Sequence, residues 1–456
     1  MSNDVLKVRA GFVGFGEVNT PREFIDNRCR VAADELKKRG VELFETAPVS
    51  DDPQGLQAQR AVEELSKYDF DALVVCVAGW IPTWAVMKVI EPFKHKPMLL
   101  WGLSGWRENG HFVTTADQAG TTALRAPMTE QGYNFKYLVN LKDSAPRYDE
   151  AAAYLRAASA TAQMHKVLIG MNGYRDMRLY GTLYDGNLLK NKIGAEIEHF
   201  ELLEIADIIK DIPQSEIDAL ADKIRKNWNF VRAPKEGTVE NSVRLSLAFQ
   251  RKIKDRGYDA FSFCDVDGVK KLLKFAPAGA LTLLHDEMEI PSVPENDSYG
   301  AVTQLIMKYL TGQNPAYMEF YEFTEKSALM GVPDYVPASA VDGKITVMPN
   351  AFGSFGEGLL NVSKVKTGEV TIVRLAQVGG ELVIHASLGT AVTPETWEEA
   401  GWAPPAPQLP SIEVKFDYCA DEFLKNVMAQ HYIVTYGNNM ELLENYCAIN
   451  GLKLIK

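Results

Sequence analysis

Two kinds of hydrophobic pattern alternate along the first part of the chain. Short, continuously apolar runs such as Val8–Phe15 and Ala72–Val77 have the length of buried strands. Between them lie longer amphipathic stretches such as Pro21–Arg39, which have the period of a helix. Strands that alternate with helices are typical of a parallel sheet covered on both faces. The pattern therefore predicts a doubly wound α/β domain over residues 1–145.

The alternation of strands and helices begins again after residue 145. Asp149–Met164 is rich in alanine and is expected to be a helix, and a strand follows it and ends in the Gly173 turn. Ala260–Cys264 is expected to be a further strand. An extended segment, Met288–Val293, precedes a helical run, Ala301–Leu310. These elements predict a second doubly wound domain over residues 146–317.

The pattern changes from Met318 onward. Short strands such as Glu369–Val378 alternate with turns, and the proline-rich piece Pro404–Pro407 interrupts them. Strands of this spacing favour a small barrel or sandwich, here residues 318–456, which ends in a closing helix and a short strand. The predicted fold class is thus α/β, with two doubly wound parallel-sheet domains followed by a C-terminal small β-barrel domain.

Composition narrows the range of partners. The chain has 456 residues, a formal net charge of −12 and no block of basic residues, so nucleic acid is not expected as a partner. No apolar run approaches the ~18 residues of a membrane-spanning helix, and the first residues lack the charge and apolar pattern of a signal peptide. The five cysteines are widely spaced, which favours reduced thiols and a cytoplasmic location.

A glycine motif offers one alternative function. Gly11–Asn19 follows a strand, precedes a helix and contains G-x-G, as dinucleotide-binding turns do. Asn19 stands in place of the third glycine, and Pro21 delays the start of the helix. The motif therefore favours an ordinary strand-to-helix turn over NAD binding.

Two strand ends carry paired acidic residues. Asp265 and Asp267 follow one predicted strand, and Glu295 and Asp297 follow another. Carboxyl ends of parallel strands are where open α/β sheets bind ligands, and paired carboxylates suit a divalent cation or acid–base chemistry. His431, at the start of an apolar strand, is the histidine most suited to join them.

Four arginines near the ends of predicted strands are candidates for anion binding. Arg22 and Arg28 lie on the first predicted helix, although their spacing does not place them on one face with Arg30. Arg175 and Arg178 follow the Gly173 turn. Guanidinium groups match the oxygens of carboxylates, sulfonates and phosphates.

These segments together resemble the L-fucose/L-arabinose isomerase family. Pro294–Thr303 resembles the family's acidic signature before a helix, and His431–Gly437 resembles its C-terminal histidine strand. Cys264–Asp267 is similar to a strand end at which the family has Glu in place of Asp267. Because aspartate is shorter, Asp265 remains an alternative first ligand.

The resemblance implies a hexameric enzyme that uses Mn²⁺ or a similar divalent ion to interconvert aldoses and ketoses. Asp267, Asp297 and His431 would hold the ion, and Asp267 and Asp297 would move protons. Glu295 and the four arginines Arg22, Arg28, Arg175 and Arg178 would contact the sugar. The arginines make an anionic sugar such as sulfoquinovose one option.

The sequence therefore predicts a metal-dependent aldose–ketose isomerase that works through a cis-enediol. Three alternatives stay open: an NAD-dependent oxidoreductase, a metal-dependent sugar-acid lyase or aldolase, and a non-catalytic sugar-binding protein. NAD found bound on purification would favour the first, and cleavage products in place of a ketose would favour the second. Retention of sugar without turnover would favour the third.

Overall fold

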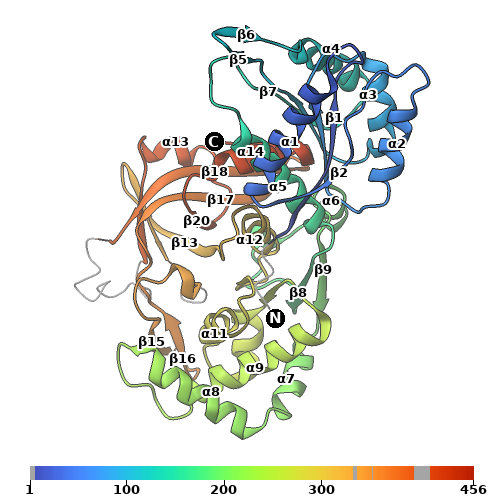
Figure 1. Ribbon diagram of the computed structural model, residues 1–456. Coiled ribbons are helices and arrows are strands. Elements are labelled where there is room, and N and C mark those ends of the chain that lie inside the picture. The colour runs from blue at the N-terminus through green and yellow to red at the C-terminus, as the bar shows by residue number, and fades with distance from the viewer. Residues whose placement is uncertain (1–5, 332–335, 352, 395–410) are drawn as a thin grey trace. The chain divides into compact units, whose positions relative to one another are not determined.

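The computed structural model describes residues 6–331, 336–351, 353–394 and 411–456, which form two compact units (Figure 1). The N-terminal unit comprises Asp4–Ala162 with Glu441–Asn450, and the C-terminal unit comprises Gln163–Met440 with Gly451–Lys456. The predicted strands of both the second and third domains fall in the C-terminal unit. The predicted boundaries at residues 145 and 317 remain predictions, and Pro404–Pro407 lies outside the described residues.

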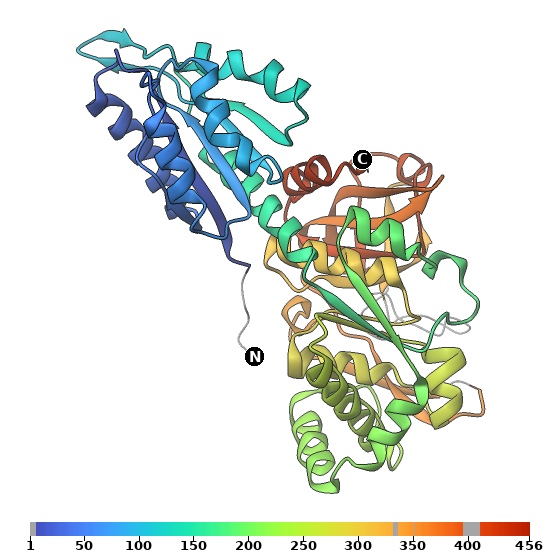
Figure 2. The ribbon, with the colours of Figure 1, turned by 90° about the vertical axis from the view of Figure 1, so that its right-hand side faces the viewer.

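The N-terminal unit contains a five-stranded parallel sheet with the strand order β2-β1-β3-β4-β7. Helices lie on both sides of it (Figure 2), as the predicted doubly wound fold requires. The strands are β1 (Val8–Phe15), β2 (Val41–Glu45), β3 (Ala72–Val77), β4 (Met98–Gly102) and β7 (Phe135–Val139). The main helices are α1 (Arg22–Lys38), α2 (Leu56–Leu65), α3 (Thr83–Ile90), α4 (Asp117–Glu130) and α5 (Tyr148–Met164).

Close packing explains both the burial of this sheet and the glycine after β1. Every residue of β3 is buried. A Cβ atom on Gly16 would lie 2.4 Å from Cδ1 of Ile25, so glycine allows α1 to approach the end of β1. The helix α14 (Met440–Asn450) returns to this unit late in the chain, where Asn445 accepts a hydrogen bond of 3.1 Å from Nζ of Lys136.

The C-terminal unit contains a second parallel sheet with the order β12-β11-β8-β9. Its strands are β8 (Leu168–Asn172), β9 (Glu196–Phe200), β11 (Ala260–Phe263) and β12 (Ser292–Val293). The predicted strand Met288–Val293 is longer than the observed one. Helix α11 (Ala278–Met288) runs into this segment, and Glu289 then takes a left-handed backbone with φ of +53°. Only two residues remain to pair with β11.

Six antiparallel strands close into a barrel in the same unit, which confirms the predicted fold class. Their cyclic order is β17-β20-β13-β14-β19-β18, and β21 (Lys453–Ile455) adds in parallel to β18. The barrel strands are β13 (Ala316–Phe323), β14 (Ser327–Gly331), β17 (Gly368–Val378), β18 (Glu381–Val392), β19 (Ile412–Lys415) and β20 (His431–Tyr436).

Two strands from the predicted barrel region, residues 318–456, belong elsewhere. β15 (Thr346–Ala351) and β16 (Glu357–Asn361) form a hairpin, and β15 pairs in parallel with the short β10 (Asn229–Phe230). The hairpin contacts α9 (Thr238–Arg256) and α11 and lies away from the barrel strands in Figure 1. The sequence pattern predicts a strand at Gly343–Met348, which overlaps β15, but it does not show which strand pairs with it.

Helix α12 (Ser298–Thr311) connects the second sheet to the barrel. It contacts β11 and β12 on the sheet and β17 and β20 on the barrel (Figure 1). Ten successive residues, Ser298–Met307, are buried, as expected for a helix enclosed on all sides. The start of this helix is thereby fixed beside the barrel strands.

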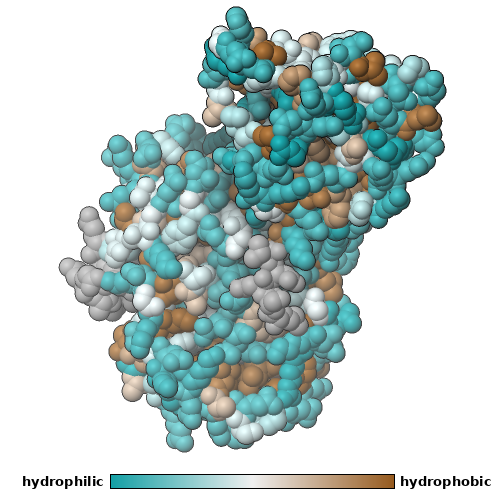
Figure 3. Space-filling model, in the orientation of Figure 1, coloured by the Kyte–Doolittle hydropathy of each residue, from teal (hydrophilic) through white to brown (hydrophobic). Residues whose placement is uncertain are grey.

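The face of the protein shown in Figure 3 is mainly hydrophilic, with hydrophobic residues in small groups. Scattered apolar residues of this kind are ordinary on protein surfaces. No helix among the described residues is both long enough and apolar enough to cross a lipid bilayer.

We predict that the buried His385 makes the stability of the barrel depend on pH. Burial lowers the pKa of His385 to about 4, whereas an unfolded histidine titrates near 6.5. Because the folded pKa is depressed, the unfolded chain binds more protons below pH 6.5, so stability falls as the pH falls. The expected loss from this residue is about 1 kcal/mol between pH 7.5 and pH 5.5.

Urea unfolding of the parent and of His385→Gln at these two pH values measures the effect. The variant should lose about 1 kcal/mol less than the parent on acidification. His95→Gln, which removes an exposed histidine, is the control and should behave as the parent does. An equal pH dependence in all three proteins would contradict the prediction.

Candidate active site

The predicted site residue Asp297 forms a buried ion pair with Arg374 of β17. Nη1 of Arg374 lies 2.5 Å from Oδ2 of Asp297 and Nη2 lies 2.8 Å from Oδ1. The arginine and aspartate side chains are 2% and 3% exposed. Asp297 also caps α12 by accepting from the backbone N–H of Gly300 at 3.0 Å. The hydroxyl of Tyr317 donates to Oδ2 at 2.9 Å.

The arginine decides the charge of this carboxyl group. Burial by itself would raise the pKa of Asp297, but the charge and hydrogen bonds of Arg374 outweigh burial and lower the pKa. Asp297 is therefore ionised at neutral pH, and both of its oxygens accept hydrogen bonds.

His431 lies beside this pair. Its ring stacks on Tyr317 with 4.5 Å between ring centroids, and it is 4% exposed. Burial lowers the pKa of His431 to about 3, with the charge of Arg374 acting in the same direction and that of Asp297 against it. The structure thus brings Asp297 and His431 together, through Tyr317, with the imidazole neutral.

Glu319, which the sequence analysis did not single out, is the cross-strand partner of His431. The two residues are directly opposed in the antiparallel pair β13–β20, so their side chains are neighbours on one face. Glu319 is half-buried, and burial raises the pKa of its carboxyl group. The signal that could have identified it is an acidic residue within the mainly buried run Ala316–Glu319.

The turn before Asp297 has an unusual backbone. Glu295 and Asn296 are both left-handed, with φ of +62° and +51°, which costs of order 1 kcal/mol for each such residue. The side chain of Asn296 stabilises the turn by donating to the carbonyls of Asn172 and Tyr174 at 3.0 and 2.6 Å. Backbone strain of this kind is concentrated at functional sites.

The other acidic strand end has a different role in the structure. The carboxylate of Asp265 accepts from the backbone N–H of Glu295 at 3.1 Å. The buried Asp176, after β8, accepts from the backbone N–H groups of Val266 and Asp267 at 2.7 Å each. These carboxylates join the three loops that follow β8, β11 and β12. The Asp267 side chain is 41% exposed and ion-paired with Lys271.

The predicted metal ligands do not fit a bound Mn²⁺. Both oxygens of Asp297 are held by Arg374, and Asp267 is paired with a lysine at the surface. Within the described residues, no three His, Cys, Asp or Glu side chains are arranged to hold a metal ion. Glu319 and neutral His431 are ligand types that Mn²⁺ accepts, but the two alone do not make a complete site.

The predicted substrate-binding arginines lie in different units. Arg22 and Arg28 belong to the N-terminal unit, and Arg175 and Arg178 belong to the C-terminal unit. Arg22 is exposed and donates to Asp26 at 2.8 Å. Arg175 lies over the ring of Tyr180, 5.2 Å from its centroid. Their role in sugar binding remains a prediction.

A cavity of about 370 Å³ lies next to Arg374 in the C-terminal unit. Tyr299 and Gln377 also line it, and the tyrosine hydroxyl donates to the amide oxygen of Gln377 at 2.9 Å. Glu319 and His431 are not among its lining residues in the part of the chain that the structure describes. The cavity is therefore distinct from the place where Glu319 and His431 meet.

Comparison with known proteins supports only a distant relationship. No family model matches the chain. An L-arabinose isomerase of Shouchella clausii (strain KSM-K16) is 23% identical over 275 residues, which covers 58% of this chain and 55% of that enzyme. The match thus spans about half the length of the relative. The similarity is to a sugar isomerase, and it does not identify a substrate.

We predict that removing Arg374 strongly destabilises the C-terminal unit. Arg374→Met leaves the charge of Asp297 buried without its partner, which typically costs about 3–5 kcal/mol. Arg256→Met is the matched control, because Arg256 forms a two-bond pair with Glu198 but its side chain is 46% exposed. The control should cost much less stability, because water already screens the exposed pair.

Denaturant unfolding of the two variants measures the difference. Adding Asp297→Asn to Arg374→Met should recover part of the loss, because the orphaned charge is then removed. Equal losses for the buried and the exposed pair would contradict the importance of the Asp297–Arg374 pair.

Proposed function

We propose that this protein is an aldose–ketose isomerase that acts on an open-chain sugar. The single observation that carries the proposal is the pairing of Glu319 with neutral His431, beside the buried Asp297–Arg374 pair. The distant similarity to an L-arabinose isomerase supports the same reaction class. The proposed site lies wholly in the C-terminal unit.

The chemistry requires a group that can take and return a proton at neighbouring carbons. A carboxyl group whose pKa is raised toward neutrality suits that role, and burial raises the pKa of Glu319. We assign to Glu319 the removal of the C2 proton of the aldose and its return at C1. His431, uncharged through burial, can bond to a sugar hydroxyl or carbonyl as a neutral donor or acceptor.

Asp297 has a different part in this proposal. The sequence analysis predicts it to move protons, but its carboxylate is stabilised in the ionised form by Arg374, which weakens it as a base. We propose that Asp297 positions the site, because its bonds hold Arg374, Tyr317 and the start of α12 together. We propose that Asp267 forms an ion pair with Lys271 at the surface and does not contact the sugar.

The isomerase proposal is tested by incubating the protein with a panel of aldoses and measuring ketose formation. L-Arabinose, L-fucose, D-arabinose and sulfoquinovose cover the neutral and anionic substrates that the resemblance suggests. Formation of a ketose from at least one aldose is expected. Cleavage products or NAD-dependent oxidation would instead favour the lyase or oxidoreductase alternatives. Size measurement of the same sample tests the hexamer, which remains a proposal.

We predict that Glu319→Gln lowers kcat by about 10²–10⁴-fold, because an amide cannot accept the proton. The fold should persist, since glutamine keeps the shape of a half-buried side chain. Glu322→Gln, an exposed position on the same strand, is the matched control and should retain full activity. If Glu319→Gln kept more than half of the parent activity, the assignment of the base would be wrong.

The proposed dependence on Mn²⁺ has its own test. If Glu319 and His431 hold Mn²⁺ together with the sugar oxygens, treatment with a chelator should abolish ketose formation, and Mn²⁺ should restore it. Because Asp267 is exposed and paired with Lys271, Asp267→Asn should leave both the metal content and the activity unchanged. Full activity of a protein shown by elemental analysis to be metal-free would disprove the requirement.

A further inference from the structure

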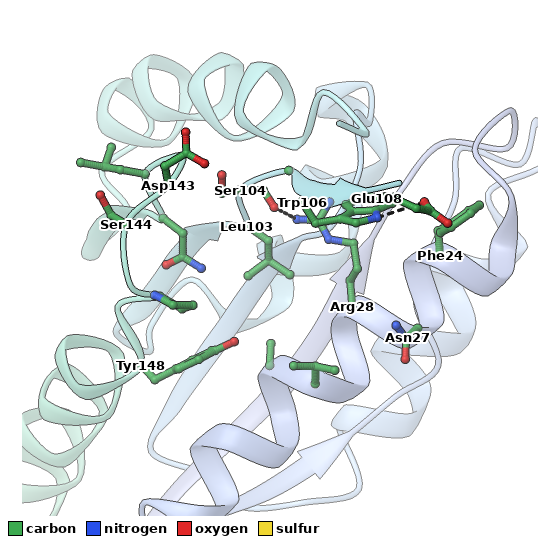
Figure 4. A pocket seen from close by; sticks show the side chains of 16 residues that line it. Phe24, Asn27, Arg28, Leu103, Ser104, Trp106, Glu108, Asp143, Ser144 and Tyr148 are labelled. Atoms are coloured by element: carbon green, nitrogen blue, oxygen red, sulfur yellow. Dashed lines mark hydrogen bonds between the residues drawn. The ribbon is translucent and has the colours of Figure 1, made fainter. Parts of the chain in front are cut away.

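The N-terminal unit contains a cavity of about 360 Å³ that the proposed isomerase site does not use. It lies at the carboxyl ends of the parallel strands β4 and β7 and is bordered by one side of α1 (Figure 4). Open α/β sheets bind ligands at this edge, and the volume falls in the range of small-molecule sites.

The side-chain amide of Asn140, in the cavity wall, has N–H donors that the protein does not use. Asn140 is 5% exposed, and its Oδ1 accepts from the indole N–H of Trp101 at 3.2 Å and the backbone N–H of Arg147 at 3.1 Å. Two donors on one atom fix which end of the amide is oxygen. The two N–H groups of Nδ2 then have no acceptor among the described residues. These N–H groups are therefore available to an oxygen acceptor in the cavity.

Arg28 supplies a second donor on the opposite wall. It is held rigidly, because Nη1 donates to the carbonyl of Ala78 at 2.9 Å and to Thr115 at 2.6 Å, and Nη2 donates to the carbonyl of Ser104 at 2.5 Å. A guanidinium group has five N–H donors, and these three bonds do not use all of them. Figure 4 shows Arg28 beneath Trp106, whose ring centroid lies 5.2 Å from the guanidinium carbon.

Two of the three charged residues of the lining, Arg28 and Asp143, are ion-paired. Arg28 lies 3.7 Å from the buried carboxylate of Asp117. Asp143 is paired with Arg107 and Lys142, and Glu108 accepts from the indole N–H of Trp106. A site with paired charges favours an uncharged ligand, since an ion would lose its hydration without gaining a counter-charge.

The remaining walls combine aromatic and hydroxyl groups. The rings of Phe24, Trp106 and Tyr148 line the cavity, together with the side chains of Ser104 and Ser144 (Figure 4). Closed sugar rings have apolar C–H faces and hydroxyls around the rim, which match aromatic faces and a ring of amide and hydroxyl groups. We propose that this cavity binds a neutral, closed-ring monosaccharide, with Asn140 and Arg28 donating to its oxygens.

Methyl glycosides provide a probe that is independent of the proposed isomerase activity. A methyl pyranoside cannot open to an aldehyde, so it cannot be isomerised, and its binding is unaffected if the isomerase proposal fails. Methyl pyranosides of arabinose, fucose and galactose, and the charged methyl glucuronoside, are titrated into the full-length protein by calorimetry. At least one neutral glycoside should bind saturably with a Kd of about 1 mM or tighter.

Variants then locate the binding. Asn140→Asp keeps an oxygen for Trp101 and Arg147 but removes the donors, and it should weaken binding at least about tenfold. Val31→Trp places a large ring into the cavity from an exposed position on α1 and should have the same effect. Lys38→Trp, exposed on α1 but outside the cavity lining, should bind as the parent does.

Several results would overturn the proposal. One is that no neutral glycoside binds saturably; another is that the charged glucuronoside binds more than about tenfold tighter than every neutral one. A third is that Val31→Trp leaves the Kd within about twofold of the parent value. This result would contradict binding in the cavity even if Asn140→Asp does not fold. Loss of binding in Lys38→Trp as well would show that the cavity is not the site.

Discussion

The buried pair of Asp297 and Arg374 is the interaction on which the C-terminal unit depends. An ionised carboxylate with almost no solvent exposure is stable only if a counter-charge and hydrogen bonds replace the lost water. Arg374 comes from the barrel and Asp297 from the start of α12, so the pair joins the barrel to the parallel sheet. Tyr317 extends the network to His431, and β13–β20 pairing extends it to Glu319.

This network also explains why the proposed site combines groups of opposite character. The arginine lowers the pKa of Asp297, whereas burial raises the pKa of Glu319 and lowers that of His431. One carboxyl group is thereby kept charged as a fixed acceptor, and a second is moved toward the range in which it can exchange a proton. Carboxyl groups whose environments separate their pKa values are typical of acid–base sites.

Local pattern predicted those parts of the fold in which local and tertiary preferences agree. The continuous apolar run of β3 and the helix α5 lie within one residue of their expected bounds. The local pattern could not predict pairing between distant segments. The β15–β16 hairpin, for example, pairs with β10, which lies more than a hundred residues earlier in the chain. Arg374 and Glu319 were not predicted as site residues for the same reason. Barrel closure and strand register determine their partners, and no neighbouring sequence motif indicates them.

The most direct test of the central claim is the fate of the migrating proton in heavy water. The protein is incubated with a converted aldose in ²H₂O, and the ketose is examined by NMR for deuterium at C1. Proton transfer through a carboxyl group that exchanges with solvent predicts deuterium at C1 in the parent, and little ketose of any kind in Glu319→Gln. Ketose that retains the substrate hydrogen completely, at undiminished rate in the variant, would contradict the account.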